Sequence, residues 1–128
     1  MDVCIPVDVE DVVRDFLADH LEAEVITYPL PDAIADECVC VRKTGGTRSD
    51  MVCDESLVSI DCRAADEQTA LSLALQASAL MAAASGNGRI HGASLNATAY
   101  LNPDPKRPDL FRYSFAALVT CRAETKEI

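Results

Sequence analysis

The chain has 128 residues, of which 21 are acidic and 11 are basic, so its formal net charge is −10 at neutral pH. An apolar fraction of 49% excludes a disordered acidic tail, and the length fits a single domain over residues 1–128. So negative a charge argues against specific binding of nucleic acid, which requires clustered lysine and arginine. The charge is uneven: residues 1–64 hold 15 acidic and 5 basic side chains, whereas residues 65–128 hold 6 of each.

Apolar side chains recur at three- and four-residue steps over residues 8–22, which predicts an amphipathic helix with Asp8 as its N-cap. An acidic outer face of such a helix is usually only a solvated face. Its carboxylates include Asp11, Asp15, Asp19 and Glu22.

Three strands are expected next, over residues 24–28, 38–44 and 51–63. Prolines at 29 and 31 end the first strand, and a glycine-rich hairpin loop is expected over residues 45–50. In the second strand Val39 and Val41 are expected on one face, opposite Cys40 and Arg42.

A second helix is predicted over residues 66–85, with Asp66 as its N-cap and Gly86 at its end. Apolar side chains surround most of this helix, so we expect the sheet to cover one side and a neighbouring subunit the other. Strands over residues 90–101 and 110–122 follow, joined by a proline-rich loop over 102–109. The order α-β-β-β-α-β-β predicts an α+β fold: a small, mostly antiparallel mixed sheet of about five strands flanked by two helices.

The start of the chain lacks the basic and apolar regions of a secretory signal, and residues 70–84 are too short and polar to span a bilayer. We therefore expect assembly in a cytoplasm and no membrane partner. The six cysteines form no C-x-x-C pair, so reduced, buried thiols are expected. The alternatives are a zinc site assembled from distant strands or a single reactive thiol.

Catalytic motifs are not evident. Residues 44–47 lack the spacing of a phosphate-binding loop, and the glycines at 86 and 88 follow a helix, where a dinucleotide motif would precede one. His20 lies at the boundary of the acidic helix, and His91 would act as a base only if a cysteine or serine converged on it. We expect no catalytic, cofactor-binding or metal-binding residues, with a small cytoplasmic α+β enzyme as an alternative.

Several segments occur in a recognisable order. A proline turn at residues 29–32 precedes the segment VRKTGGTR at 41–48, the strand at 57–64, the alanine-rich helix from Asp66 and, after a Pro/Asp loop, the strand from Phe111. This order resembles the tail terminator proteins of long-tailed bacteriophages over roughly residues 9–123. Cysteine and aspartate replace bulkier residues that are often found in the third strand.

The resemblance implies a structural virion protein at the tail–neck junction, without cofactor or catalysis. Six copies would form a ring on the completed tail tube, end its polymerisation and present a docking surface to the head. The implied partners are further copies of the chain, the major tail tube protein, a head–tail connector or stopper protein and the tape measure protein. Another head–tail joining protein, or a monomeric interaction module with no viral connection, is the alternative.

A closed ring requires two different patches that meet between neighbours. The apolar second helix and the loops at 44–50 and 102–109 are the candidates, and we hypothesise that a basic cluster at the first loop pairs with an acidic neighbour. The candidate contact residues are Arg42, Lys43, Arg48, Leu73, Leu80, Lys106 and Arg107. The acidic face of the first helix is a candidate channel lining that would repel passing DNA.

Overall fold

The computed structural model describes residues 1–28, 35–48 and 53–128. Over these residues the order of elements is β1 (Asp2–Ile5), α1 (Val9–Ala18), β2 (Glu24–Thr27), β3 (Cys38–Arg48), β4 (Cys53–Ala64), α2 (Glu67–Ala82), β5 (Ile90–Leu101), β6 (Phe111–Arg122) and β7 (Glu124–Glu127). The proline turn expected at 29–32, the last two residues of the loop expected at 45–50 and the first two of the strand expected at 51–63 lie outside the described residues.

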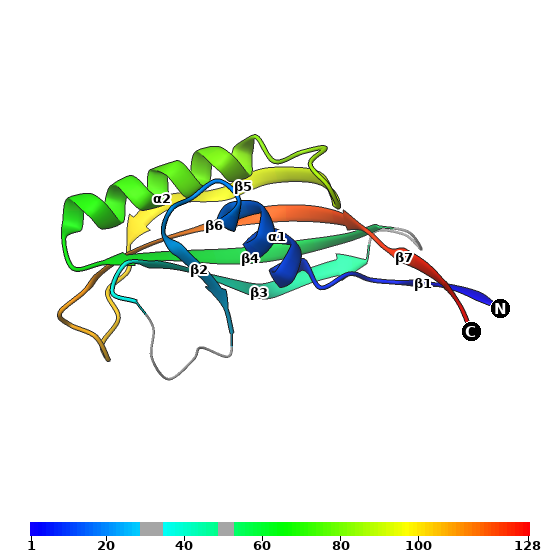
Figure 1. The fold of residues 1–128 in the computed structure, drawn as a ribbon, viewed down its shortest axis with the longest axis horizontal. Helices are drawn as coiled ribbons and strands as arrows, with labels where there is room; N and C mark the ends of the chain where they lie inside the picture. The colour runs from blue at the N-terminus through cyan, green and yellow to red at the C-terminus, as the bar shows by residue number, and fades with distance from the viewer. Residues whose placement is uncertain (29–34, 49–52) are drawn as a thin grey trace.

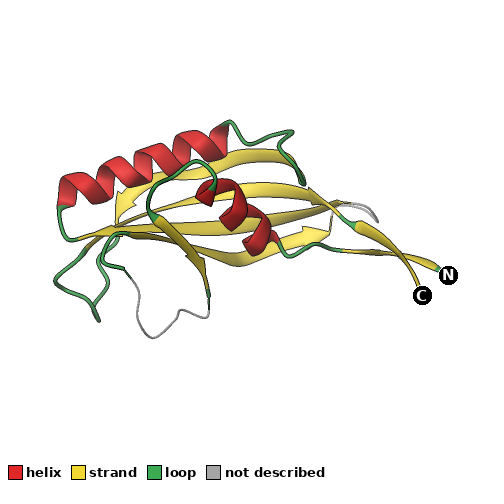
Figure 2. Cartoon of the chain, in the orientation of Figure 1, coloured by secondary structure: helices red, strands yellow, loops and turns green. Residues whose placement is uncertain are grey.

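One five-stranded sheet organises the molecule, in the order β2-β3-β4-β6-β5. Strand β2 runs parallel to β3, and the other neighbours are antiparallel. Both helices lie on the same face of this sheet, with α1 over β2 and β3 and α2 over β4, β6 and β5 (Figures 1 and 2). The α+β class and the mixed, mostly antiparallel sheet predicted from the sequence are therefore confirmed.

Rows of apolar side chains cross the helix-covered face from strand to strand. Val41 of β3 is opposite Ile60 of β4, which is opposite Phe115 of β6, and all three are buried. Helix α2 contributes small residues such as Ala74 and Ala77, so its backbone packs close to the sheet. The alternation predicted for the strand at 38–44, with Val39 and Val41 on one face, is confirmed, and the core lies between the sheet and the helices.

Helix α1 is shorter than predicted and ends at Ala18 rather than at residue 22. Asp8 is its N-cap, as expected, and accepts a hydrogen bond from the backbone N–H of Glu10 at 3.1 Å. The last turn has no basic side chain and is followed by Asp19 and Glu22, which the negative end of a helix dipole disfavours. The chain therefore leaves the helix early, although Leu21 still packs in the core.

Strand β3 is longer than predicted, because residues 45–48 of the expected loop are strand. A register irregularity between Lys43 and Gly45 accommodates the two glycines, and pairing with β4 then resumes. At Gly46 the φ angle is +150°, and an added Cβ would come within 2.5 Å of the Glu55 carbonyl oxygen. Glycine is thus required at Gly46 by close strand packing rather than by a turn.

Strands β1 and β7 were not expected from the sequence. They pair only with each other in the described sheets and form a two-stranded ribbon that projects beyond one end of the five-stranded sheet (Figure 1). Hydrogen bonds between Met1 and Ile128, at 2.7 and 3.0 Å, close its outer end. We call this ribbon, residues 1–5 and 124–128, the terminal arm.

Candidate interaction surfaces

The acidic face of α1 is partly neutralised within the chain. Arg14 forms ion pairs with Asp11 at 3.1 Å and with Asp15 at 3.3 Å. Asp19 and Glu22 are exposed at the end of the helix. The four carboxylates thus lie on or just beyond one helix, and the charge that α1 presents outward is greatest at its C-terminal end.

Two of the three basic residues of β3, Arg42 and Lys43, lie on opposite faces of the sheet, because they are neighbours on a strand. The Arg42 guanidinium lies over the Tyr28 ring, 4.7 Å from its centroid, in a cation–π contact. The side chain of Arg48 lies outside the described part of the chain. The membership of Arg48 in the predicted basic cluster therefore stays a prediction.

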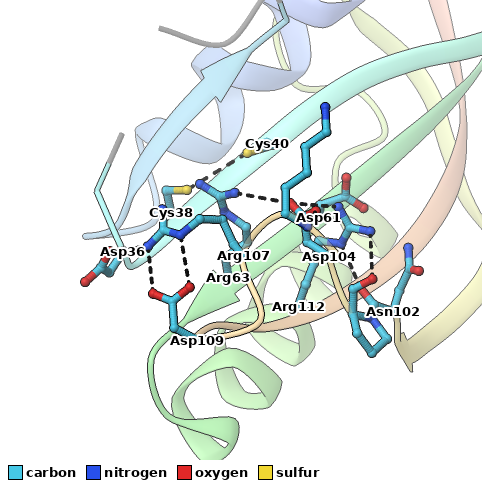
Figure 3. Close-up of polar contacts among 12 residues, drawn as sticks. Asp36, Cys38, Cys40, Asp61, Arg63, Asn102, Asp104, Arg107, Asp109 and Arg112 are labelled. Atoms are coloured by element: carbon cyan, nitrogen blue, oxygen red, sulfur yellow. Dashed lines mark hydrogen bonds and ion pairs between the residues drawn. The ribbon is translucent and has the colours of Figure 1, made fainter. Parts of the chain in front are cut away.

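Residues 102–109 form a strap that is tied to the face of the sheet opposite the helices (Figure 3). Arg112 of β6 donates to the carbonyl oxygen of Asn102 at 2.7 Å. The Asp104 carboxylate lies between Arg63 and Arg112, at 3.8 and 3.7 Å. Charged side chains from two strands, Arg63 and Arg112, therefore hold this loop to the sheet.

The two candidate basic residues of the strap have different environments. Arg107 forms ion pairs with Asp109 at 3.0 Å and with Asp36 at 3.1 Å, so it holds the strap to the segment that precedes β3. Hydrogen bonds from Arg107 lower the pKa of Asp109. Lys106 is exposed, with its backbone N–H bonded to Asp104 at 3.0 Å. Of the two, Lys106 presents its charge outward.

Two thiols and a buried guanidinium lie near the strap (Figure 3). The sulfur atoms of Cys38 and Cys40 are 3.9 Å apart, and Cys38 is opposite Arg63 in the β3–β4 register. Hydrogen bonding from Cys40, supported by Arg63, lowers the pKa of Cys38 to about 6. The same hydrogen bond and burial raise the pKa of Cys40. Both side chains are at most 2% exposed, so these thiols are not open to a substrate in this structure.

The buried guanidinium of Arg63 is incompletely satisfied. Its side chain is 5% exposed, and its Nε and Nη2 atoms have no hydrogen-bond partner. Asp104 supplies the compensating charge from 3.8 Å. The strap therefore has an electrostatic role, because its carboxylate lies against a buried cation.

Neither histidine forms a catalytic arrangement with the groups around it. The His20 ring nitrogen Nδ1 is 2.9 Å from the carbonyl oxygen of Phe16, one turn earlier, and His91 is exposed. Within the described residues, no three histidine, cysteine or acidic side chains converge as metal ligands would.

The side of the molecule formed by α2 and β5 is weakly charged. Leu73 is 6% exposed and packs in the chain's own core, and Leu80 is half-buried against that core. The exposed leucine of α2 is Leu75, with 55% of its surface accessible. Helical periodicity identified an apolar helix but did not show which of its leucines the sheet would cover.

A groove of about 590 Å³ separates the end of α1 from α2. Its α2 wall includes Gln68, Ser72 and Gln76. Leu75 is not among the groove residues and is exposed next to Gln76 on α2. Helix α2 therefore presents polar side chains to the groove and an exposed leucine outside it.

Comparison with known proteins identifies a shared fold. No protein-family model matches the chain, and no curated protein is similar to it in sequence. Among solved structures, the α+β architecture recurs in a chain from a structure titled "Virion of native gene transfer agent (GTA) particle". The TM-score is 0.58 with 18% sequence identity, over 87% of this chain and 84% of that chain. Neither helix in the described part of the molecule is long and apolar enough to cross a membrane.

Proposed function

We propose that this protein is a structural component of a phage-like virion, and specifically a tail terminator. The observation that carries the proposal is the fold that 87% of this chain shares with a chain of a gene transfer agent virion. The order of segments that resembles tail terminators gives independent support.

In this proposal, six copies form a ring on the end of the tail tube. The ring stops addition of the major tail tube protein and joins the tail to a connector or stopper protein of the head, and the tape measure protein is a further partner. The subunit has an acidic side at α1 and a neutral side at α2 and β5, which suits a ring whose channel face and contact face differ. The protein would be assembled in the host cytoplasm and reside at the tail–neck junction.

The acidic face of α1 is proposed to line the channel through which DNA passes. Carboxylates repel phosphates, so an acidic wall would let DNA pass without holding it. The residues proposed for this wall are Asp11, Asp15, Asp19 and Glu22. Arg14 offsets the first two, which leaves Asp19 and Glu22 as the side chains with the largest expected effect.

Tube capping tests the function directly. The tail tube protein of the same phage would be polymerised with and without this protein, and tube lengths measured by electron microscopy. We expect shorter tubes that carry labelled protein at one end, in a six-fold ring. Label along the tube walls, or tubes of unchanged length without end label, would contradict the proposal. Label found only on the head's portal complex would favour the connector or stopper alternative.

A further inference from the structure

The side formed by α2 and β5 is almost without charge. Residues 68–101 contain a single formal charge, Arg89, and this side chain forms an ion pair with Glu124 of β7. Four large apolar side chains of this stretch are 39–55% exposed: Leu75, Leu95, Tyr100 and Leu101. In a chain of net charge −10, so neutral and apolar a side requires a physical explanation.

These exposed side chains belong to neighbouring elements. Strand β5 is the edge strand of the sheet, and α2 runs along it on the side away from α1 (Figure 1). Leu75 is exposed on α2 outside the groove that Gln76 lines, and Leu101 lies on β5 itself. We call this surface, formed by the exposed residues of α2 outside the groove and by the β5 edge, the neutral side.

The terminal arm carries apolar side chains that its own domain leaves uncovered. Met1 is 81% exposed, Ile128 72% and Ile5 39%, and none of them belongs to the hydrophobic core cluster. An isolated two-stranded ribbon is only marginally stable in water. A projecting ribbon with exposed apolar side chains gains stability when a neighbouring molecule packs against it.

We propose that the terminal arm of one subunit packs on the neutral side of the next subunit. This inference rests on the proposed ring and identifies its subunit contact. Each copy carries −10, and its arm holds three acidic side chains against Lys126, so the arm of one copy meets the least repulsion on the side of the next copy that carries no acidic residue. The arm and the neutral side are different surfaces, and such a head-to-tail contact can close into a ring.

Side-chain packing, rather than addition of a strand to β5, is the expected form of this contact. The β5 ladder has register irregularities after Ile90, Leu95 and Ala97. The Ser85 hydroxyl is hydrogen-bonded to both backbone groups of Ala93. It accepts from the Ala93 N–H at 2.9 Å and donates to the Ala93 carbonyl oxygen at 3.3 Å. An arm strand would find an interrupted row of backbone partners, whereas the apolar side chains remain accessible.

Two neighbouring substitutions on α2 provide the first test. Leu75→Glu places a carboxylate in the proposed contact, and Gln76→Glu places the same carboxylate on the flank that faces α1. We expect Leu75→Glu to weaken association of the copies about tenfold or more, since an unpaired charge is costly in an apolar contact. Association would be measured by sedimentation and by ring occupancy on tail tubes. Equal behaviour of the two variants, both folded by circular dichroism, would overturn the proposal.

Photo-crosslinking identifies which surface occupies the neutral side. A benzoylphenylalanine at Leu101 should crosslink to residues 1–5 or 124–128 of another copy, whereas one at Glu22 on the acidic side should not. Crosslinks from Leu101 to α2 or β5 of another copy, to another protein, or to nothing would overturn the proposal. The crosslinking would be carried out on concentrated protein alone and on tail tubes capped with the protein. Capping with no arm crosslink rejects only this contact, whereas an arm crosslink without capping rejects only the terminator function.

Discussion

The Glu10 carboxylate of α1 accepts a hydrogen bond from the backbone N–H of Lys43 on β3, with Oε2 and N 2.9 Å apart. Strand β2 pairs with β3 only as far as Val41. Beyond that point β3 itself forms the edge of the sheet, and Lys43 lies on this uncovered stretch. At the opposite edge, the Ser85 hydroxyl is hydrogen-bonded to the backbone N–H and carbonyl oxygen of Ala93 on β5. Side chains thus cap both edges of the sheet, a protection against unwanted strand pairing.

Glu10→Ala should destabilise the fold by about 1 kcal/mol, because the Lys43 N–H loses its acceptor. Urea denaturation would measure the free energy of unfolding, and hydrogen exchange would measure protection of the Lys43 amide. Glu10→Gln keeps an oxygen acceptor and should retain most of that protection. If the Lys43 amide exchanges equally slowly in Glu10→Ala, the carboxylate does not cap this edge.

Gly46→Ala should destabilise the β3–β4 hairpin severely, by about 2–3 kcal/mol or more, because φ is positive and the Glu55 carbonyl is in the way. Gly45→Ala is the matched control, since an added Cβ there meets nothing within 4 Å. Thermal denaturation of both variants would decide the point. Similar melting temperatures for the two variants would show that the close approach at Gly46 is not required.

Asp104→Asn removes the carboxylate that faces the buried Arg63 guanidinium. We expect a loss of about 2 kcal/mol in the free energy of unfolding, because Arg63 would be left without a compensating charge. Asp109→Asn removes an exposed carboxylate from the same strap and should change stability little. Equal stability of the Asp104 variant and the wild type would show that the strap does not stabilise Arg63.

The thiol pair predicts a pH dependence with a definite sign. The pKa of Cys38 is lowered to about 6, so its contribution to stability is present above the ordinary thiol pKa and is lost as the pH falls through about 6. Burial raises the pKa of Cys62, so that thiol reduces stability once the pH exceeds the ordinary thiol range. Ultraviolet thiolate absorbance should show an ionisation near pH 6 that Cys38→Ser removes. Absence of that ionisation from the wild type would refute the Cys38 assignment.

Asp19→Lys tests the proposed channel lining. A cation is well tolerated at a helix C-terminus, so α1 should stay folded. We expect tubes capped with this variant to retain double-stranded DNA more strongly than wild-type tubes, as measured by filter binding at low salt. Glu55→Lys, an equal charge change on β4, is the control. DNA retention that is the same for both variants would place Asp19 away from the channel.

Hydrophobic periodicity was sufficient to predict both helices, the five strands of the main sheet and the class of fold. The terminal arm was missed because β7 has no apolar side chain and because β1 and β7 pair from opposite ends of the chain, which no local pattern shows. Residues 45–48 were predicted as loop because paired glycines are typical of turns, whereas here Gly46 permits close strand contact.

The candidate surfaces were harder to predict than the fold. Arg107 pairs with Asp36 across 71 positions of the chain, and no local pattern encodes so distant a contact. Helix α2 is apolar around most of its circumference, so its sequence could not show that Leu73 is buried and Leu75 exposed. The side that a helix turns to a sheet follows from tertiary packing.

Because Met1 and Ile128 are hydrogen-bonded to each other, both ends of the chain are at the same point in space. A fluorescent protein or affinity tag fused to either terminus would therefore occupy the same place, at the outer end of the terminal arm. Labels for microscopy are better inserted elsewhere, for example next to the exposed Lys106. The same proximity means that a short peptide could join the two ends, so the chain is a natural subject for circular permutation.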